Sequence, residues 1–129
     1  MPVVIDASAL VELLVQSRQA PAVVQAVGSA EMVAPDVINP EVLSALRRLE
    51  RAGKLRAGRA SQAVNDLLDA GVRCFPTLPL LPQAWTLRAN VSATDACYVA
   101  LARDLGCPLV TRDLRLSRAP GLGVPMITV

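Results

Sequence analysis

The stretch VVIDASALVELLVQ, residues 3–16, decides the fold class. Its first three residues form a short apolar run, which predicts a buried strand that ends at Asp6. Residues 7–16 then predict a helix. When strands alternate with helices in this way, right-handed crossovers join parallel strands and helices cover both faces of the sheet.

The same alternation continues along the chain. Further strands are expected over residues 32–34, 72–75, 109–111 and 125–128, and further helices over residues 20–27, 40–52, 56–69, 83–91 and 92–104. Asn39, Pro40 and Glu41 have the order of a capping residue, a first helical position and an acid in the first turn. We therefore expect one domain over residues 1–129, a three-layer α/β/α fold around a parallel sheet of roughly five strands.

Composition agrees with a folded domain without disulfides. The hydrophobic fraction is 53% and the aromatic fraction only 2%, so the core must consist of aliphatic side chains. The three cysteines form no Cys-x-x-Cys pair and are expected as buried free thiols in a reducing compartment. No segment reaches the roughly 18 apolar residues of a membrane span, and the apolar start lacks a basic lead. We expect a soluble cytoplasmic protein.

The chain has no histidine. This absence excludes Ser-His-Asp and Cys-His catalysis, histidine general acid–base chemistry and histidine-ligated zinc. Hydrolysis near neutral pH would then depend on carboxylates, together with a hard cation.

Four acids are placed where the predicted elements begin or end. Asp6 follows the first strand, Asp113 follows the fourth strand by two residues, and Glu41 and Asp95 each lie in the first turn of a helix. Such positions converge at the carboxyl edge of a parallel sheet, where ligands bind in α/β proteins. Each acid also has a purely structural explanation, as a helix cap, a partner of a helix dipole, a capping-box member with Ser92, or a turn residue.

Electrostatics favours a metal site if the four acids meet. Two carboxylates about 5 Å apart repel by about 3 kcal/mol at an effective dielectric constant near 20, so protons or a cation must neutralise the cluster. Oxygen ligands in this number predict Mg²⁺ or Mn²⁺, and a carboxylate-bound metal beside basic residues predicts phosphodiester hydrolysis.

Basic residues are concentrated in one part of the chain. Only one of the thirteen is a lysine, and six of them lie between residues 47 and 59. Arginine suits the geometry of phosphate, which favours a nucleic-acid surface; a solvated helical hairpin explains the same pattern equally well.

At these residues the sequence resembles the PIN-domain family, and within it the VapC-type toxins of bacterial toxin–antitoxin pairs. The resemblance covers essentially the whole chain and is carried by four pieces in the family's order: VIDASAL (4–10), PEVLSALRR (40–48), DACYVALA (95–102) and LVTRD (109–113). Each piece alone is a weak signal, whereas the ordered set is fairly specific.

The resemblance implies an endoribonuclease that requires Mg²⁺ or Mn²⁺, a homodimer with a five-stranded parallel sheet, and inhibition by a VapB-type antitoxin whose tail fills the active-site groove. Its residue assignments make Asp6, Asp95 and Asp113 metal ligands and Glu41 a ligand or the group that orients the attacking water. Ser8 and Thr111 would support the acids. Apart from the resemblance, the suitability of arginine for phosphate makes Arg47, Arg48 and Arg112 candidates for RNA contact. Thr94 departs from the family pattern, in which many members have an aromatic residue before the third acid.

Other functions fit the acids less well. A receiver-like phosphotransfer domain needs a lysine after a late strand, and the only lysine is Lys54. A haloacid-dehalogenase-type phosphatase needs Asp-x-Asp after the first strand, where this chain has Asp6-Ala7-Ser8. The remaining alternative is a catalytically silent PIN-like module that binds RNA or protein.

Overall fold

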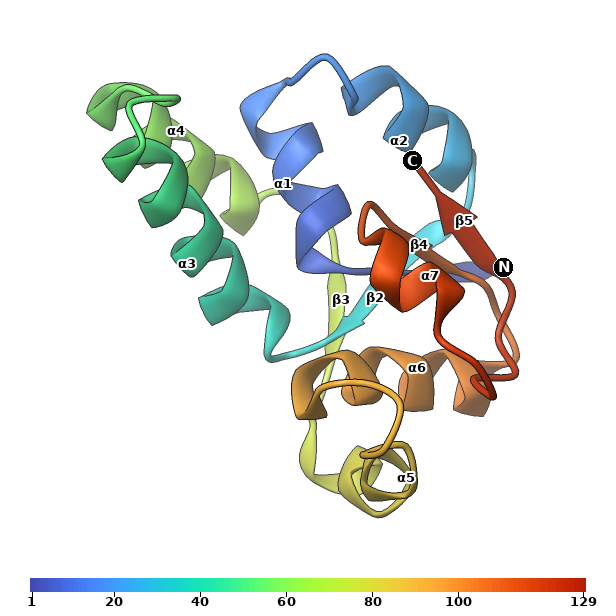
Figure 1. The fold of residues 1–129 in the computed structure, drawn as a ribbon. Helices are drawn as coiled ribbons and strands as arrows, with labels where there is room; N and C mark the ends of the chain where they lie inside the picture. The colour runs from blue at the N-terminus through green and yellow to red at the C-terminus, as the bar shows by residue number, and fades with distance from the viewer.

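The computed structural model describes residues 1–129, and strands alternate with helices along the chain (Figure 1). The strands are β1 (Pro2–Ile5), β2 (Glu31–Pro35), β3 (Arg73–Phe75), β4 (Leu109–Thr111) and β5 (Met126–Thr128). The helices are α1 (Ala7–Val15), α2 (Ala20–Val27), α3 (Ile38–Arg51), α4 (Ala57–Leu68), α5 (Leu81–Thr86), α6 (Ala93–Leu105) and α7 (Leu114–Arg118), with a short 3₁₀ helix, η1 (Leu78–Leu80), before α5.

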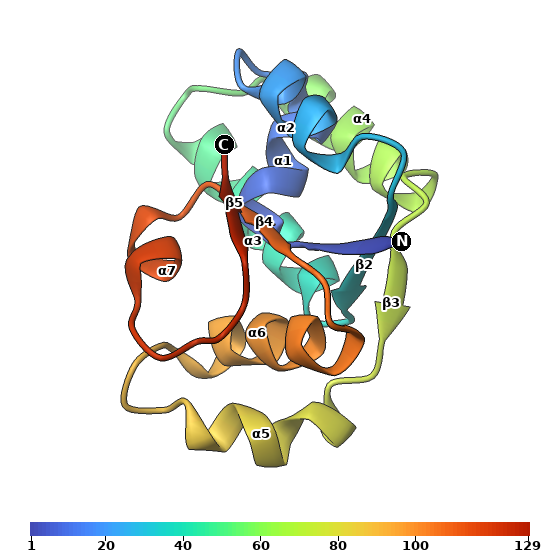
Figure 2. The same ribbon diagram turned by 90° about the vertical axis from the view of Figure 1, so that its right-hand side faces the viewer.

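All five strands form one parallel sheet in the order β3-β2-β1-β4-β5. Figure 2 shows α1 and α2 on one face of this sheet and α6 on the other, with α5 outside α6. The helices α3 and α4 extend beyond the sheet on the side of α1 (Figure 1). The predicted three-layer α/β fold is therefore confirmed. Because β1 lies between β2 and β4, the carboxyl ends of β1 and β4 are neighbours.

The hydrophobic core joins the sheet to α1 on one side and α6 on the other. Every residue from Ala96 to Ala102 is buried, as the uninterrupted apolar run predicts. Tyr98 is the largest of the fully buried side chains. Before this buried run, Ala93 is exposed and Asp95 is only partly buried, so the first turn of α6 is accessible to solvent.

Several local predictions were wrong. The helix expected to start after Asn39 begins at Ile38, with Val37 as its capping residue. Asn39 and Pro40 lie inside its first turn, where a proline costs nothing because amides there have no acceptor within the helix. The helix expected over residues 83–91 is the shorter α5, which starts earlier for the same reason and has Pro82 in its first turn.

The structure also contains a helix that was not predicted, α7, and one exposed thiol. The five residues of α7 are too few to show a helical period. Cys97 and Cys107 are buried free thiols as expected, whereas Cys74 is exposed on the edge strand β3, which has a neighbour on one side only.

None of the helices combines the length and the apolar character that crossing a lipid bilayer requires.

Candidate active site

Asp6 is the most constrained of the predicted site residues. It follows β1, caps the N-terminus of α1, and only 4% of its surface is exposed. Its Oδ1 accepts hydrogen bonds from the Ala9 amide (3.0 Å) and the Ser8 hydroxyl (2.6 Å), and its Oδ2 accepts one from the Thr111 hydroxyl (2.5 Å). Three donors thus hold the carboxylate in place at the end of the strand.

The two hydroxyls that contact Asp6 also receive hydrogen bonds from the chain after β4. The Arg112 amide donates to Ser8 Oγ at 3.0 Å, and the Asp113 amide donates to Thr111 Oγ1 at 2.9 Å. The position of Asp113 is therefore tied to that of Asp6 through Thr111. Ser8 and Thr111 lie where the family resemblance expects residues that support the acids.

The other two aspartates lie at helix N-termini. Asp113 caps α7, and its Oδ1 accepts from the Arg115 amide (2.9 Å) and the Leu116 amide (3.3 Å). Asp95 lies in the first turn of α6, where its amide, and not its carboxylate, bonds to the capping Ser92 hydroxyl (3.2 Å). No protein group donates a hydrogen bond of good geometry to the Asp95 carboxylate, although the neighbouring Ser92 hydroxyl lowers the pKa of this carboxyl.

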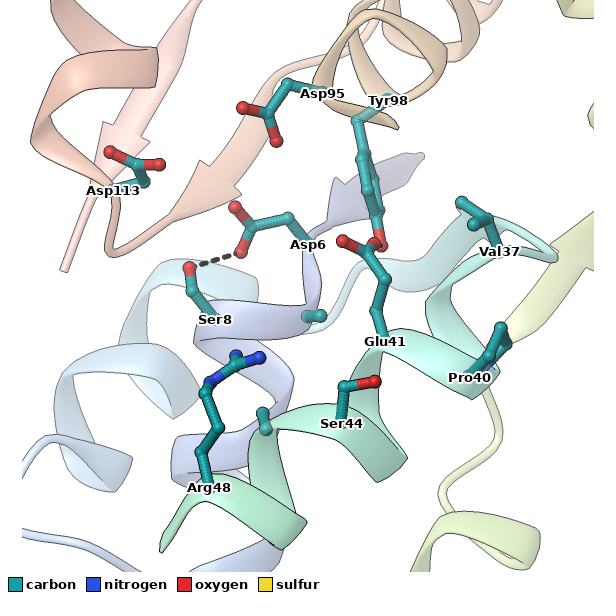
Figure 3. A pocket seen from close by; sticks show the side chains of 12 residues that line it. Asp6, Ser8, Val37, Pro40, Glu41, Ser44, Arg48, Asp95, Tyr98 and Asp113 are labelled. Carbon is teal, nitrogen blue, oxygen red and sulfur yellow. Dashed lines mark hydrogen bonds between the residues drawn. The ribbon is translucent and has the colours of Figure 1, made fainter. Parts of the chain in front are cut away.

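Glu41 comes from α3, and Figure 3 shows it on the other side of Asp6 from Asp113. The buried Tyr98 holds the Glu41 carboxylate in place. The Tyr98 hydroxyl donates to Glu41 Oε1 at 2.5 Å. Tyr98 lies three residues after Asp95 on α6, so both side chains lie on the same helix face. Sequence reasoning missed Tyr98; its spacing from Asp95 is the one signal that pointed to it.

The four acids meet around one cavity of about 530 Å³. Figure 3 shows the carboxylates of Asp6, Asp95 and Asp113 turned toward a common space, with Glu41 beside Tyr98 at its edge. The same cavity is lined by Ser8, Ser44 and Arg48, among other residues. The predicted convergence of the acids at the edge of the sheet is thus a feature of the structure.

The three arginines expected to contact RNA are placed differently. Arg48 lines the cavity, and Figure 3 shows its guanidinium group below Ser8. Arg47 is exposed and does not line the cavity. Arg112 forms an ion pair with Glu12 of α1 at 2.8 Å. Arg115, which sequence reasoning did not single out, is close enough to Asp95 to lower the pKa of that carboxyl.

The environment disfavours negative charge on three of the acids. Burial raises the pKa of Asp6, and Asp95 adds to the increase, although the bonds from Ser8, Thr111 and Ala9 oppose it. Burial also raises the pKa of Glu41, as do Asp95 and Asp6, against the Tyr98 bond and Arg48. The pKa of Asp95 is raised by burial and by Asp113, against the Ser92 hydroxyl and Arg115, which lower it. Any cation that enters the cavity relieves this cost.

The donor set fits a hard divalent cation. No three acidic or cysteine side chains already stand close enough together to hold one metal ion between them. Free oxygen lone pairs nevertheless remain on all four acids: Asp6 Oδ2 accepts a single bond, Glu41 Oε2 and Asp113 Oδ2 accept none, and both oxygens of Asp95 are unpartnered. Mg²⁺ is commonly held by one or two carboxylates and completes its shell with water and substrate phosphate, so this spacing suits it.

Comparison with known proteins points in the same direction. The family model of the PIN domain matches residues 3–122. Ribonuclease VapC9 of Mycobacterium tuberculosis is 37% identical over 127 residues, which cover 98% of each chain. Ribonuclease VapC3 of the same species is 41% identical over 118 residues, covering 91% of this chain and 86% of that protein. Among solved structures, VapBC2 from Rickettsia felis bound to a promoter DNA fragment has a similar fold, with a TM-score of 0.69 at 11% identity over 99% of this chain and 98% of that one.

Proposed function

Because this chain belongs to the PIN-domain family of VapC ribonucleases, we propose that it hydrolyses RNA phosphodiester bonds as the toxin of a toxin–antitoxin pair. The observation that supports this proposal most strongly is the convergence of four carboxylates from distant parts of the chain on one cavity. Capping a helix or a turn explains each acid singly, but it does not explain why all four gather with free oxygen atoms.

The proposed cofactor is Mg²⁺ or Mn²⁺, with Asp6, Asp95 and Asp113 as its ligands and Glu41 as a further ligand or the group that orients the attacking water. A divalent cation in this cavity would neutralise the acids, polarise a phosphate oxygen and lower the pKa of a water molecule toward neutrality. Oxygen-only donors and the absence of histidine support a hard cation over zinc.

The protein's own groups have separable roles in this proposal. Ser8, Thr111 and the Ala9 amide orient Asp6, and Thr111 also holds the backbone of Asp113. Tyr98 occupies one oxygen of Glu41, which leaves Oε2 as the atom that accepts a hydrogen bond from water. Asp6, Glu41 and Asp113 therefore keep a defined orientation before substrate arrives, which is what catalysis by positioning requires.

The proposed partners are RNA as substrate and a VapB-type antitoxin as inhibitor. The antitoxin is supported by the likeness to VapBC2. The homodimer implied by the resemblance and the cytoplasmic location expected from the composition remain predictions.

The test is cleavage of total bacterial RNA and of single-stranded RNA oligonucleotides by purified protein, with Mg²⁺ or Mn²⁺ and with EDTA. We expect cleavage only with the cation, and Asp6→Asn and Asp95→Asn should lose more than the roughly 10- to 100-fold that loss of an outer-shell partner costs. Cleavage that continues in EDTA, or in either variant, would reject these roles. RNA binding without cleavage under all conditions would favour the silent binding module.

A further inference from the structure

A second hollow adjoins the catalytic cavity and has the opposite electrostatic character. This groove has a volume of about 340 Å³ and lies between α1 and α3. It shares Ser8, Ala45 and Arg48 with the catalytic cavity, so the two hollows lie side by side. We call it the α1–α3 groove. Four acids line the catalytic cavity, whereas the α1–α3 groove has one acid and three cations.

The only acid of the groove is already neutralised. Glu12 of α1 pairs with Arg112 at 2.8 Å through Oε1, and its Oε2 accepts the hydroxyl of Ser17. Arg48 and Lys54 take part in no ion pair and donate no side-chain hydrogen bond to the protein. The groove therefore presents two unpaired positive charges, one of them at its junction with the catalytic cavity.

Neutralising the negative charge of the four catalytic acids explains the position of only one of these two cations. Arg48 does lower the pKa of Glu41. Lys54, in the turn between α3 and α4, does not line the catalytic cavity. The rest of the lining includes small or apolar side chains such as Val11, Leu49 and Ala52, which leave room along the groove. Unpaired cations along a groove that adjoins the acidic cavity suit a chain of phosphates, because each phosphate carries one negative charge.

We propose that the α1–α3 groove binds the sugar–phosphate backbone of the RNA strand on one side of the scissile bond, with Arg48 nearest the cleaved linkage and Lys54 contacting a phosphate farther along. This inference rests on the proposed ribonuclease function. The proposal therefore predicts an asymmetric interaction with the substrate. Phosphates on one side of the cleaved bond contact Arg48 and Lys54, and phosphates on the other side contact neither. An acidic protein segment is the alternative occupant.

The first experiment measures the affinity for a fluorescein-labelled single-stranded RNA of mixed sequence across a range of salt concentrations. All proteins carry Asp95→Asn, so that the RNA remains uncut. Affinity falls as salt rises, and the plot of log affinity against log salt has a negative slope. In the double variant R48A/K54A this slope should become less steep by about 1.4, because each lost phosphate contact on a single strand removes about 0.7. The matched control R51A/R56A removes two exposed cations of the same segment that do not line the groove, and its slope should stay close to that of the parent.

The second experiment locates the contacts on an RNA oligonucleotide that the wild-type protein cuts at one mapped position. Single phosphates are replaced by neutral methylphosphonates. Substitutions that weaken binding through the groove should cluster on one side of the cut, and their effect should vanish in R48A/K54A. Effects spread evenly over both sides, or unchanged in the double variant, would overturn the proposal.

Two further outcomes separate this proposal from its alternatives. If R48A/K54A leaves the RNA salt slope unchanged but abolishes binding of a poly-glutamate peptide, the groove belongs to a protein partner and the inference is wrong. If the unmodified protein cleaves no RNA, the proposed function fails, whereas the salt slopes still decide whether the groove binds a phosphate backbone.

Discussion

Thr111 donates a hydrogen bond to Asp6 across 105 residues of sequence. The same hydroxyl accepts the amide of Asp113, so one buried side chain sets the separation of two acids from neighbouring strands. Ser8 forms a parallel link from Asp6 to the Arg112 amide. The geometry of the site therefore depends on two hydroxyls that carry no charge.

Replacing Thr111 with valine should impair the site while leaving RNA binding almost intact. Valine preserves the shape of threonine but frees the Asp113 amide and removes one donor from Asp6. We expect kcat to fall, and the Mn²⁺ concentration for half-maximal activity to rise, by roughly 10- to 100-fold, with little change in KM. Thr111→Ser should restore most of the activity. Equal losses in both variants would show that packing, not the hydroxyl, matters.

Replacing Tyr98 with phenylalanine removes the donor to Glu41 and keeps the aromatic ring in the core. Glu41 would then be free to rotate, so activity should fall by roughly tenfold at saturating Mn²⁺. A hydrogen bond to a charged group contributes about 1.5–3 kcal/mol, so a measurable decrease in the free energy of unfolding should accompany this loss. Unchanged cleavage rates in Tyr98→Phe would mean that the phenol only fills space.

Part of this arrangement follows from the sequence and part does not. The meeting of Asp6 and Asp113 was predictable, because the carboxyl ends of adjacent parallel strands share an edge. Arg48 follows Glu41 by seven residues, about two helical turns, so the sequence already places these two residues on one face of α3, and Arg48 rather than Arg47 lines the cavity. Tyr98 and Glu41 are 57 residues apart in the sequence and lie on different helices, so only the packing of α3 against α6 determines their hydrogen bond.

The stability of the metal-free protein should depend on pH in a particular direction. Burial raises the pKa values of Asp6, Glu41 and Asp95. Between the ordinary carboxyl pKa of about 4 and these raised values, the folded protein binds more protons than the unfolded chain. In EDTA, these groups contribute most to the free energy of unfolding at pH values below the ordinary carboxyl pKa. That contribution is lost as pH rises through the raised pKa values. Urea denaturation at several pH values measures how the free energy of unfolding changes with pH.

Comparison with Asp95→Asn isolates this contribution from that of the other carboxylates. The variant should show a smaller loss of stability as pH rises, because it lacks one of the acids with a raised pKa. Identical pH profiles for the two proteins would contradict the electrostatic account.

Asp95→Asn should also raise the Tm of the metal-free protein at neutral pH. The substitution removes a charge that burial and Asp113 both disfavour, and we expect this gain to outweigh the lost interaction of the acid with the helix N-terminus. With Mn²⁺ the order should reverse, because only the wild type gains from the cation. Asp69→Asn, an exposed substitution at the end of α4, should not respond to Mn²⁺. A variant less stable than wild type in EDTA would make Asp95 chiefly a helix-terminal residue.

The most direct measurement is the anomalous diffraction of Mn²⁺ in crystals soaked with the ion at near-neutral pH. The account predicts an anomalous peak inside the catalytic cavity, coordinated directly by carboxylate oxygens of one or two of Asp6, Asp95 and Asp113 and reaching the others through bound water. The same soak of an Asp6→Asn crystal should lose the peak. Manganese bound elsewhere on a protein whose cavity stays empty would contradict the claim that these acids form a cation site.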